Sequence, residues 1–357
     1  MSPAQIRTAV LPVTVGTTQD ARMARPEARA KAAPEAGSAT ATRAGAILRG
    51  QKQAQAILAR GSKSFALAGA LLGSGIRQDA AVLYAWCRLA DDRLDLAPSD
   101  QRRQAVTELR AELDAVYRGS VSHPLLVALH DLVTRIQLPR AYLEALIDGF
   151  AMDAEGAYYS SASALDLYAY HVAGVVGLMM CQVLGVRDQH CLPRAAHLGM
   201  AMQLTNICRD VVEDWRYGRQ YLPLDQITPD KLRQAAEASP GADSARATVA
   251  LTVAALLERA DGYYESGLKG LNGLGWRSAL AIGAAARIYR AIGRRIAKRR
   301  FDVFAGRAVV SLPTKLVLAG ASAVSLLRDL PRRLLRAKTR LARPTTTVRF
   351  SDVQNPV

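Results

Sequence analysis

Two short acidic motifs could carry the chemistry of this chain, and each lies inside an apolar stretch with helical periodicity. The first reads Asp91-Asp92-Arg93-Leu94-Asp95, and the second reads Asp210-Val211-Val212-Glu213-Asp214. Acid pairs at this spacing often only decorate a solvated helix face. Here the flanking residues are aromatic and aliphatic on nearly every side, which predicts that both helices are buried.

Each motif continues a polar stripe along one face of its helix, at intervals of three or four residues. The stripes consist of Tyr84, Arg88, Asp91 and Asp95 in the first helix and of Gln203, Asn206, Asp210 and Asp214 in the second. Unpaired carboxylates in a helical interior would cost several kcal/mol or take up protons. The stripes therefore need cationic partners or a bound metal, and we predict a metal rather than a purely structural network of ion pairs.

The ligand type indicates which metal to expect. Carboxylates without His or Cys companions are typical of a hard cation, Mg²⁺ or Mn²⁺, rather than zinc or iron. Mg²⁺ is usually held by one or two carboxylates together with substrate phosphates, so the missing ligand would be a diphosphate. Arg88 and Arg209 lie beside the two motifs and could bind the same oxygens through charge-assisted hydrogen bonds. Alternatively, they only neutralise the neighbouring acids.

The elements that position these motifs should all be helices. Half of the 357 residues are hydrophobic, and no segment alternates apolar and polar residues in the manner of a strand. Length alone would allow one to three domains, but the sequence shows no internal repeat and no second domain. We predict an all-α fold with one large core over residues 45–320.

Two flanking segments are predicted outside this domain. Residues 1–44 mix Ala, Arg, Thr and Pro with few acids and no apolar periodicity, which is typical of a disordered extension. Their Arg-rich, acid-poor composition also resembles a transit peptide, but a bacterial chain rich in Ala and Arg has the same composition, and we favour that interpretation. Residues 321–357 form the other segment, a basic C-terminal tail.

Charge is concentrated near the C-terminus. Residues 287–350 contain 17 Lys and Arg but only two acids, and so carry +15 of the net charge of +16. Nucleic-acid binding is one interpretation, but the chain has no recognisable nucleic-acid module. Leucines interleave with the basic residues, which fits attachment to an anionic membrane surface. A solvated charged tail is the alternative.

Other features argue against further cofactors and against a membrane span. No Gly-rich fingerprint opens a helix after a strand, so no nucleotide cofactor is expected. The four cysteines lack metal-like spacing and are predicted to be reduced and buried. The stretch 169–186 is apolar enough to suggest a transmembrane helix. Its marginal length and its His171 and Gln182 favour a buried helix in the wall of a cavity.

The motifs occur in an order that resembles the squalene/phytoene synthase family. The matching segments are Ser62-Lys63-Ser64-Phe65, residues 84–95, 168–177 and 203–214, Tyr221-Leu222-Pro223, and residues 307–313. The likeness covers roughly residues 46–320 and is closest to family members of bacterial carotenoid pathways. It implies an isoprenoid-synthase (terpene synthase-type) helical bundle around a central cavity.

The resemblance also implies an activity. Two geranylgeranyl diphosphates would condense head to head, through a cyclopropyl diphosphate intermediate, to give the C40 hydrocarbon phytoene and release diphosphate. Such an enzyme would be cytoplasmic and could bind peripherally to the inner face of a bacterial membrane, with downstream carotenoid enzymes as partners. Three other activities remain open: a squalene- or dehydrosqualene-type synthase using C15 farnesyl diphosphate, a chain-elongating prenyl diphosphate synthase, and a non-catalytic scaffold.

Residue roles follow from the resemblance position by position. The metal ligands would be Asp91, Asp95, Asp210 and Asp214. Substrate contacts would be Ser62, Tyr84, Arg88, Tyr168, Gln203, Asn206, Arg209, Tyr221, Tyr289 and Arg307. Tyr168 and Phe65 could stabilise carbocations through their ring faces. One departure concerns Gly156-Ala157-Tyr158-Tyr159, where relatives often place a basic residue before the tyrosine, so one expected phosphate contact is missing.

Overall fold

A computed structural model describes residues 36–61, 63–156, 158–186, 188–237, 241–328 and 347–354; the side chains of residues 36–41, 63 and 64 are not described. Throughout these ranges the regular elements are helices, with no strand, which confirms the all-α class. Residues Ala41–Val357 form one compact unit, and Met1–Thr40 form a separate one.

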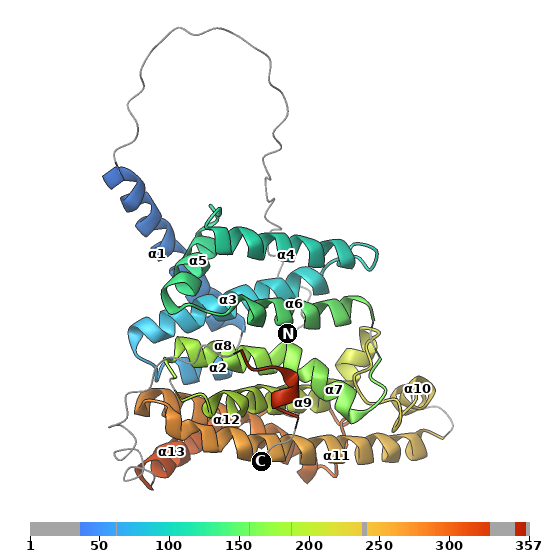
Figure 1. The fold of residues 1–357 in the computed structure, drawn as a ribbon. Coiled ribbons are helices and arrows are strands. Elements are labelled where there is room, and N and C mark those ends of the chain that lie inside the picture. Colours follow the sequence, from blue (N-terminus) through green and yellow to red (C-terminus); the bar gives the residue numbers. More distant parts are fainter. Residues whose placement is uncertain are drawn as a thin grey trace, which may run out of the picture. The chain divides into compact units, whose positions relative to one another are not determined.

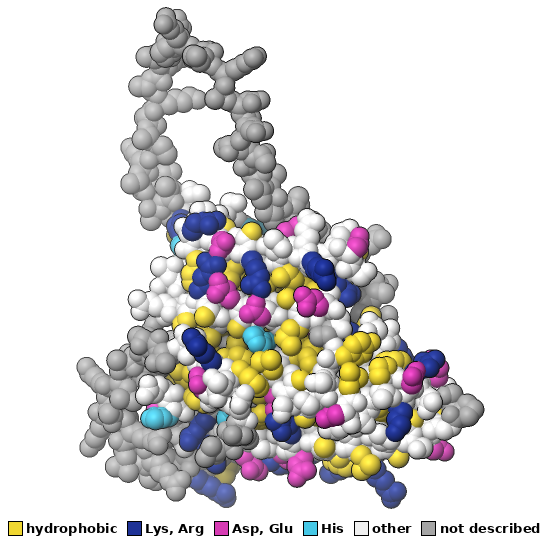
Figure 2. Space-filling model, turned by 45° about the vertical axis from the view of Figure 1, so that its right-hand side comes forward, with side chains coloured by type: hydrophobic (Ala, Val, Ile, Leu, Met, Phe, Trp, Pro, Cys, Tyr) yellow, Lys and Arg dark blue, Asp and Glu magenta, His cyan; other side chains and the backbone are white. Residues whose placement is uncertain are grey.

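The helices follow one another in the order α1 (Ala36–Gly61), α2 (Lys63–Gly69), α3 (Ser74–Asp95), α4 (Arg102–Arg118), α5 (Pro124–Ile136), α6 (Arg140–Ala154), α7 (Ala162–Ala169), η2 (Tyr170–Gly174), α8 (Val175–Val183), α9 (Cys191–Arg216), α10 (Pro229–Glu237), α11 (Ala242–Lys269), η3 (Gly270–Gly273), α12 (Trp276–Lys298), α13 (Leu312–Arg328) and η4 (Phe350–Asp352). Within the unit Ala41–Val357, α4 and α5 lie at one end, α11 and α13 lie at the other, and α9 runs between them (Figure 1). On the face in Figure 2, acidic and basic side chains intermingle over the upper helices, and hydrophobic side chains gather in a band below.

Helix α9 is the central element and carries the second acidic motif. It packs along α11 and also contacts α8 and α12. Leu204, Ile207, Cys208 and Val211 are buried and surround the polar stripe, as the periodicity predicted. Glycine permits the closest approach of α8 to α9, because a Cβ atom on Gly177 would lie 2.2 Å from the carbonyl oxygen of Ala195.

One apolar helical run, Ala162–Val183, is formed by α7, η2 and α8 in succession. Its length and composition would suffice to cross a membrane, but 56% of its apolar window is buried inside the protein. The predicted buried helix at 169–186 is therefore confirmed in position, although it begins earlier. Its middle turn, η2, is a π-helix that starts two residues after Tyr168, and such turns are frequent at functional sites.

The structure corrects the N-terminal boundary of the helical part. Helix α1 begins at Ala36 rather than near residue 45. Alanines are frequent after Pro34 and no proline follows until Pro98. Alanine has the highest helix propensity, and a helix tolerates proline only in its first turn, so the helix can start soon after Pro34. The rest of the predicted extension, residues 1–35, lies outside the described residues.

The C-terminal boundary also differs from the prediction. Helix α13 continues through residue 320 to Arg328, and residues 347–354 pack on the helical core instead of belonging to a free tail. Val353 is completely buried, and the ring of Phe350 lies 5.6 Å from that of Tyr170. Sequence analysis missed this docking because the short segment has no periodicity that could mark it as core.

Polar contacts hold the same C-terminal segment to three helices. The Tyr170 hydroxyl donates to the carbonyl oxygen of Val348 at 2.7 Å, and the Val348 amide donates to the Tyr142 hydroxyl at 3.2 Å. Nε2 of His197 lies 2.9 Å from the carbonyl oxygen of Val353. Burial lowers the pKa of His197. Because a carbonyl oxygen can only accept, Nε2 of the ring carries the hydrogen and donates to Val353.

Candidate functional site

The first acidic motif occupies the last turns of α3. Arg88 pairs with Asp91 at 3.4 Å and with Asp92 at 2.6 Å. Burial and the negative charge of Asp95, opposed by the Arg88 guanidinium, raise the pKa of Asp91 to about 7. A carboxyl group with this pKa is easily protonated near neutral pH, and a nearby cation would favour its charged form.

The second motif lies near the end of α9 and is closely paired with arginines. Nε of Arg209 donates to Asp210 at 2.8 Å, and Nε of Arg307, from the loop before α13, contacts the same carboxylate at 2.9 Å. Burial raises the pKa of Asp214 to about 7, with a further contribution from Asp210. This motif therefore combines a fully paired carboxylate with one that is poorly neutralised.

Arg219 links the two motifs. It follows α9 in the chain, and its Nη2 lies 2.6 Å from Oδ1 of Asp95 at the end of α3. Burial raises the pKa of both Asp214 and Asp153, and the positive charge of Arg219 opposes that rise. The fold thus brings two acidic motifs that are more than a hundred residues apart into one electrostatically coupled group.

Asp153 is a site residue that the sequence analysis missed. It lies in the last turn of α6, where its carboxylate accepts hydrogen bonds from the Tyr168 hydroxyl at 2.7 Å and from the Tyr221 hydroxyl at 3.0 Å. Burial raises its pKa, and Asp95 contributes in the same direction. The only signal available in the sequence was an acid directly after the apolar stretch 149–152.

Three tyrosine rings pack together above this carboxylate. The ring centroids of Tyr168 lie 5.0 Å from those of Tyr159 and 5.2 Å from those of Tyr221. Tyr159 and Tyr168 are almost completely buried, and the hydroxyl of Tyr159 has no hydrogen-bond partner. The cluster presents aromatic faces next to the acidic group, and Tyr159, like Arg219, was not predicted.

A second aromatic group gathers three of the predicted substrate contacts. Phe65 from α2 stacks on Tyr289 from α12 at 5.5 Å and meets Tyr84 from α3 edge-on at 6.2 Å. Tyr84 lies one turn before Arg88 on the stripe of the first motif. The aromatic group therefore adjoins the first acidic motif.

The stripe on α9 contains one unsatisfied polar atom. Nδ2 of Asn206 donates to Oε1 of Gln203 at 3.4 Å, but the buried Oδ1 of Asn206 accepts no hydrogen bond. A buried acceptor without a partner costs about 1–3 kcal/mol. Because Asn206 lies one turn before Asp210, a cation or a substrate group bound beside the motif would satisfy it.

These residues fit a hard divalent cation. Throughout the described ranges, no three His, Cys, Asp or Glu side chains already form a cluster able to hold a metal ion. Mg²⁺ does not need such a cluster, because one or two carboxylates and substrate phosphates usually hold it. The donors present are oxygens, two carboxyl groups have a pKa of about 7, and Asn206 has a free acceptor.

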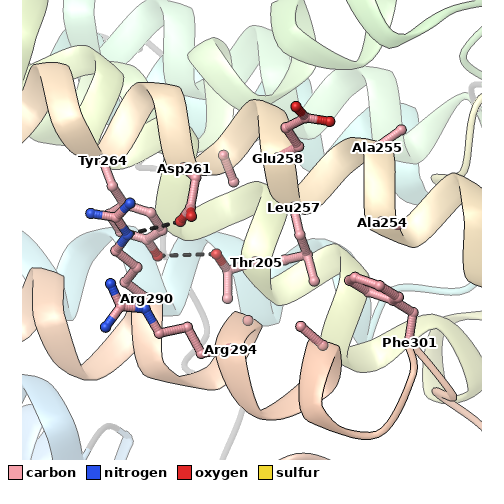
Figure 3. A pocket seen from close by; sticks show the side chains of 13 residues that line it. Thr205, Ala254, Ala255, Leu257, Glu258, Asp261, Tyr264, Arg290, Arg294 and Phe301 are labelled. Atoms are coloured by element: carbon pink, nitrogen blue, oxygen red, sulfur yellow. Dashed lines mark hydrogen bonds and ion pairs between the residues drawn. The ribbon is translucent and has the colours of Figure 1, made fainter.

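A surface groove lies apart from this site. It has a volume of about 440 Å³, is formed mainly by α11 and α12, and has Thr205 and Tyr264, 3.0 Å apart, on its floor. Figure 3 shows Arg290 directed toward Asp261 on its wall. None of the predicted site residues lines it, because Thr205 is rotated by about 100° from Asn206 on α9.

Among the predicted residues, Ser62 lies outside the described ranges.

An all-α bundle with two acidic motifs on facing helices and aromatic walls beside them defines the class of helical prenyl diphosphate enzymes. The chain belongs to the squalene/phytoene synthase family, whose model matches residues 58–314. Its members are prenyltransferases that depend on divalent metal ions. Membership confirms the enzymatic prediction and disfavours both a scaffold and a chain-elongating synthase.

Individual relatives agree with this assignment. The chain is 42% identical over 271 residues to a 15-cis-phytoene synthase of a Paracoccus species, covering 74% of this chain and 87% of that one. It is 38% identical over 290 residues to the 15-cis-phytoene synthase of Pantoea ananas, covering 77% and 93%. A crystal structure of a dehydrosqualene synthase in complex with ligand superposes with a TM-score of 0.69 at 26% identity, covering 80% of this chain and 99% of that one.

Proposed function

We propose that this protein condenses two geranylgeranyl diphosphates head to head to form phytoene in carotenoid biosynthesis. The first condensation gives a cyclopropyl diphosphate and releases one diphosphate and one proton; rearrangement of this intermediate releases the second diphosphate and a second proton. The observation that carries the proposal is the coupling of both acidic motifs, through Arg219 and Asp153, beside two aromatic clusters. The relatives named phytoene synthases support C20 substrates.

Arginines and carboxylates divide the work of binding the diphosphate. Asp91, Asp95, Asp210 and Asp214 would hold Mg²⁺, or Mn²⁺ in its place. When bound, the cation supplies Lewis-acid charge that stabilises the departing diphosphate. The arginines that pair with these carboxylates would turn to phosphate oxygens, to which they form strong bidentate hydrogen bonds. These arginines are Arg88, Arg209, Arg219 and Arg307.

The aromatic residues would manage the carbocations. The ring faces of Tyr168 and Phe65 offer negative quadrupole density to a nearby cation. Asp153 would fix the orientation of the Tyr168 ring by accepting a hydrogen bond from its hydroxyl group. Close packing of Tyr159 and Tyr221 on either side leaves little space for water, which would otherwise quench a cation. Gln203, Asn206, Tyr84, Tyr221, Tyr289 and Ser62 would complete the substrate contacts.

We also propose where the enzyme works. Its substrates carry long hydrocarbon chains and its product is a hydrocarbon, so a cytoplasmic enzyme held at the inner face of the membrane would obtain and release both efficiently. The basic C-terminal segment would supply the attraction to anionic lipid. Downstream carotenoid enzymes would then take phytoene from the same membrane.

Product analysis tests the activity directly. Purified protein with Mg²⁺ is incubated separately with C20 geranylgeranyl diphosphate and C15 farnesyl diphosphate. The hydrocarbon products are separated by chromatography and identified by mass spectrometry. We expect a C40 triene from the C20 substrate and little or no C30 product. A dominant C30 product would support the dehydrosqualene-type alternative, and the absence of either hydrocarbon would overturn the proposal.

A further inference from the structure

Helix α13 presents a continuous apolar face away from the protein. Its outward aliphatic residues are Leu312, Leu316, Val317, Val324 and Leu327, which are 51–70% exposed. At 100° per residue these positions, together with Gly320, fall within one side of the helix. No acidic residue occurs in α13. A large exposed apolar patch of this kind marks a surface that binds something.

The inward face of α13 has the opposite character. Ser322 is its one fully buried residue; it accepts a hydrogen bond from Nη1 of Arg287 on α12 at 3.1 Å and donates to the carbonyl oxygen of Leu318 at 3.0 Å. An ordinary surface helix turns its apolar side inward. The contact of α13 with the rest of the protein is made by Ser322 and by the half-buried Leu318. The five outward aliphatic residues are not part of that contact and stay free for an external partner.

The charge around this face identifies the partner as an anionic lipid surface. Lys315 and Arg328 lie on the helix, and the 18 residues that follow it contain six Lys and Arg and one Asp. Two copies of a chain with net charge +16 would repel each other at such a surface. Nucleic acid would be attracted by the positive charge, but it would not bury the exposed leucines. An anionic bilayer satisfies both the apolar face and the basic residues.

We propose that α13 lies in the plane of an anionic membrane surface, with its outward aliphatic face among the acyl chains and the basic residues at the headgroups. The inference rests on the proposed function for its biological setting and adds to it the surface that makes the contact.

The same helix connects the membrane surface to the acidic site. Arg307, which contacts Asp210 and Glu213, precedes Leu312 by five residues. Five residues span at most about 17 Å. A membrane-bound α13 would therefore hold the arginine at the diphosphate site within a short distance of the bilayer from which a prenyl chain enters.

The experiment compares vesicle binding by wild-type protein and by the double variant Leu316→Asp/Val324→Asp. Vesicles of phosphatidylglycerol and phosphatidylcholine are sedimented with the full-length protein at low and high salt. We expect the double variant to bind at least tenfold more weakly, and the wild type to bind weakly to vesicles of phosphatidylcholine alone. Leu251→Asp is the matched control, since Leu251 is 73% exposed on α11, and it should bind like the wild type.

Further readouts separate the possible outcomes. Circular dichroism and the rate with detergent-dispersed substrate should be unchanged in the double variant, and Leu316→Ser/Val324→Ser, which adds no charge, should lose part of the binding. Equal vesicle binding by the double variant and the wild type would overturn the inference. The inference would also be overturned if the wild type formed a dimer, and the double variant lost this dimer but still bound vesicles. A protein that binds vesicles through α13 but makes no hydrocarbon would contradict only the proposed function.

Discussion

The hydroxyl of Tyr168 donates a 2.7 Å hydrogen bond to the carboxylate of Asp153, and this contact joins helix α7 to helix α6 beside the acidic site. The same carboxylate accepts a second phenol, that of Tyr221. Two aromatic rings with expected roles in catalysis are thus oriented by one buried acid. The acid itself carries a raised pKa, because burial and the nearby Asp95 disfavour its charge.

Replacing Asp153 should reduce turnover more than substrate binding. Each tyrosine donates to a different oxygen of Asp153, and Asp153→Asn replaces one of these two acceptors with an NH2 donor. Loss of ring orientation can cost about a hundredfold in rate. We expect kcat to fall by roughly 10–100-fold with a smaller change in KM. Steady-state kinetics and circular dichroism make the measurement. Asp148→Asn on the same helix is the control, because Asp148 only pairs with Arg110 at the surface; equal effects of both variants would contradict the orienting role.

Removing a metal ligand should abolish turnover without unfolding the protein. Asp91→Ala deletes a carboxylate whose charge is disfavoured by burial. Asp210→Ala deletes the carboxylate that pairs with Arg209 and Arg307. We expect undetectable product formation, unchanged helicity, and loss of wild-type activity in excess chelator. The control is Asp230→Ala, whose side chain is 80% exposed on α10. Wild-type rates in either motif variant would refute the assignment of that motif to the metal.

Mg²⁺ binding should weaken as the pH falls below about 7. In the metal-free protein the pKa values of Asp91 and Asp214 are both raised to about 7, so below this pH both carboxyl groups are largely protonated. Protons then compete with the cation, and the affinity should drop about tenfold per pH unit for each carboxyl group that must lose a proton. Calorimetric titration with Mg²⁺ at pH 6, 7 and 8 measures this. A dissociation constant independent of pH would show that neither group is a ligand.

The size of residue 69 should determine product length. A Cβ atom on Gly69 would meet no other atom within 4 Å, so a larger side chain can enter the space beside α2, one turn from Phe65. Gly69→Phe should abolish C40 product and retain or increase C30 product from the C15 substrate. Overpacking could cost about 1–3 kcal/mol, so thermal unfolding is measured in parallel, with Gly69→Ala as the conservative control. A folded Phe variant that makes C40 product at the original rate would refute this position.

The docked C-terminal segment should contribute to stability. Val353 is fully buried, and its truncation in Val353→Ala should lower the free energy of unfolding by about 1–3 kcal/mol. The exposed Val309 provides the matched control, Val309→Ala, with little expected change. Denaturant titration gives both values. Equal stability of the two variants would mean that residues 347–354 do not stabilise the fold. In that case, a truncation after Arg328 should reduce membrane binding without reducing stability.

Helical periodicity alone was enough to find the polar stripes of α3 and α9. The positions of Asp91, Asp95, Asp210 and Asp214 within each stripe depend only on 3.6 residues per turn, which is a local property of the chain. The family likeness also rests on local motifs, and it led to the same fold and activity. The boundaries were less accurate, since the ends of α1 and α13 depend on what packs beside them.

Tertiary packing decided the remaining features. Asp153 contacts Tyr168 and Tyr221, and Arg219 contacts Asp95, only because the chain folds. These partners are 15 to 124 residues away, so no local spacing predicts the contacts. Leucines in α13 have the same local pattern as core leucines, yet α12 receives the opposite face of that helix. Burial depends on which helix faces come together in three dimensions, and periodicity defines the faces of a helix without stating which of them meets another part of the protein.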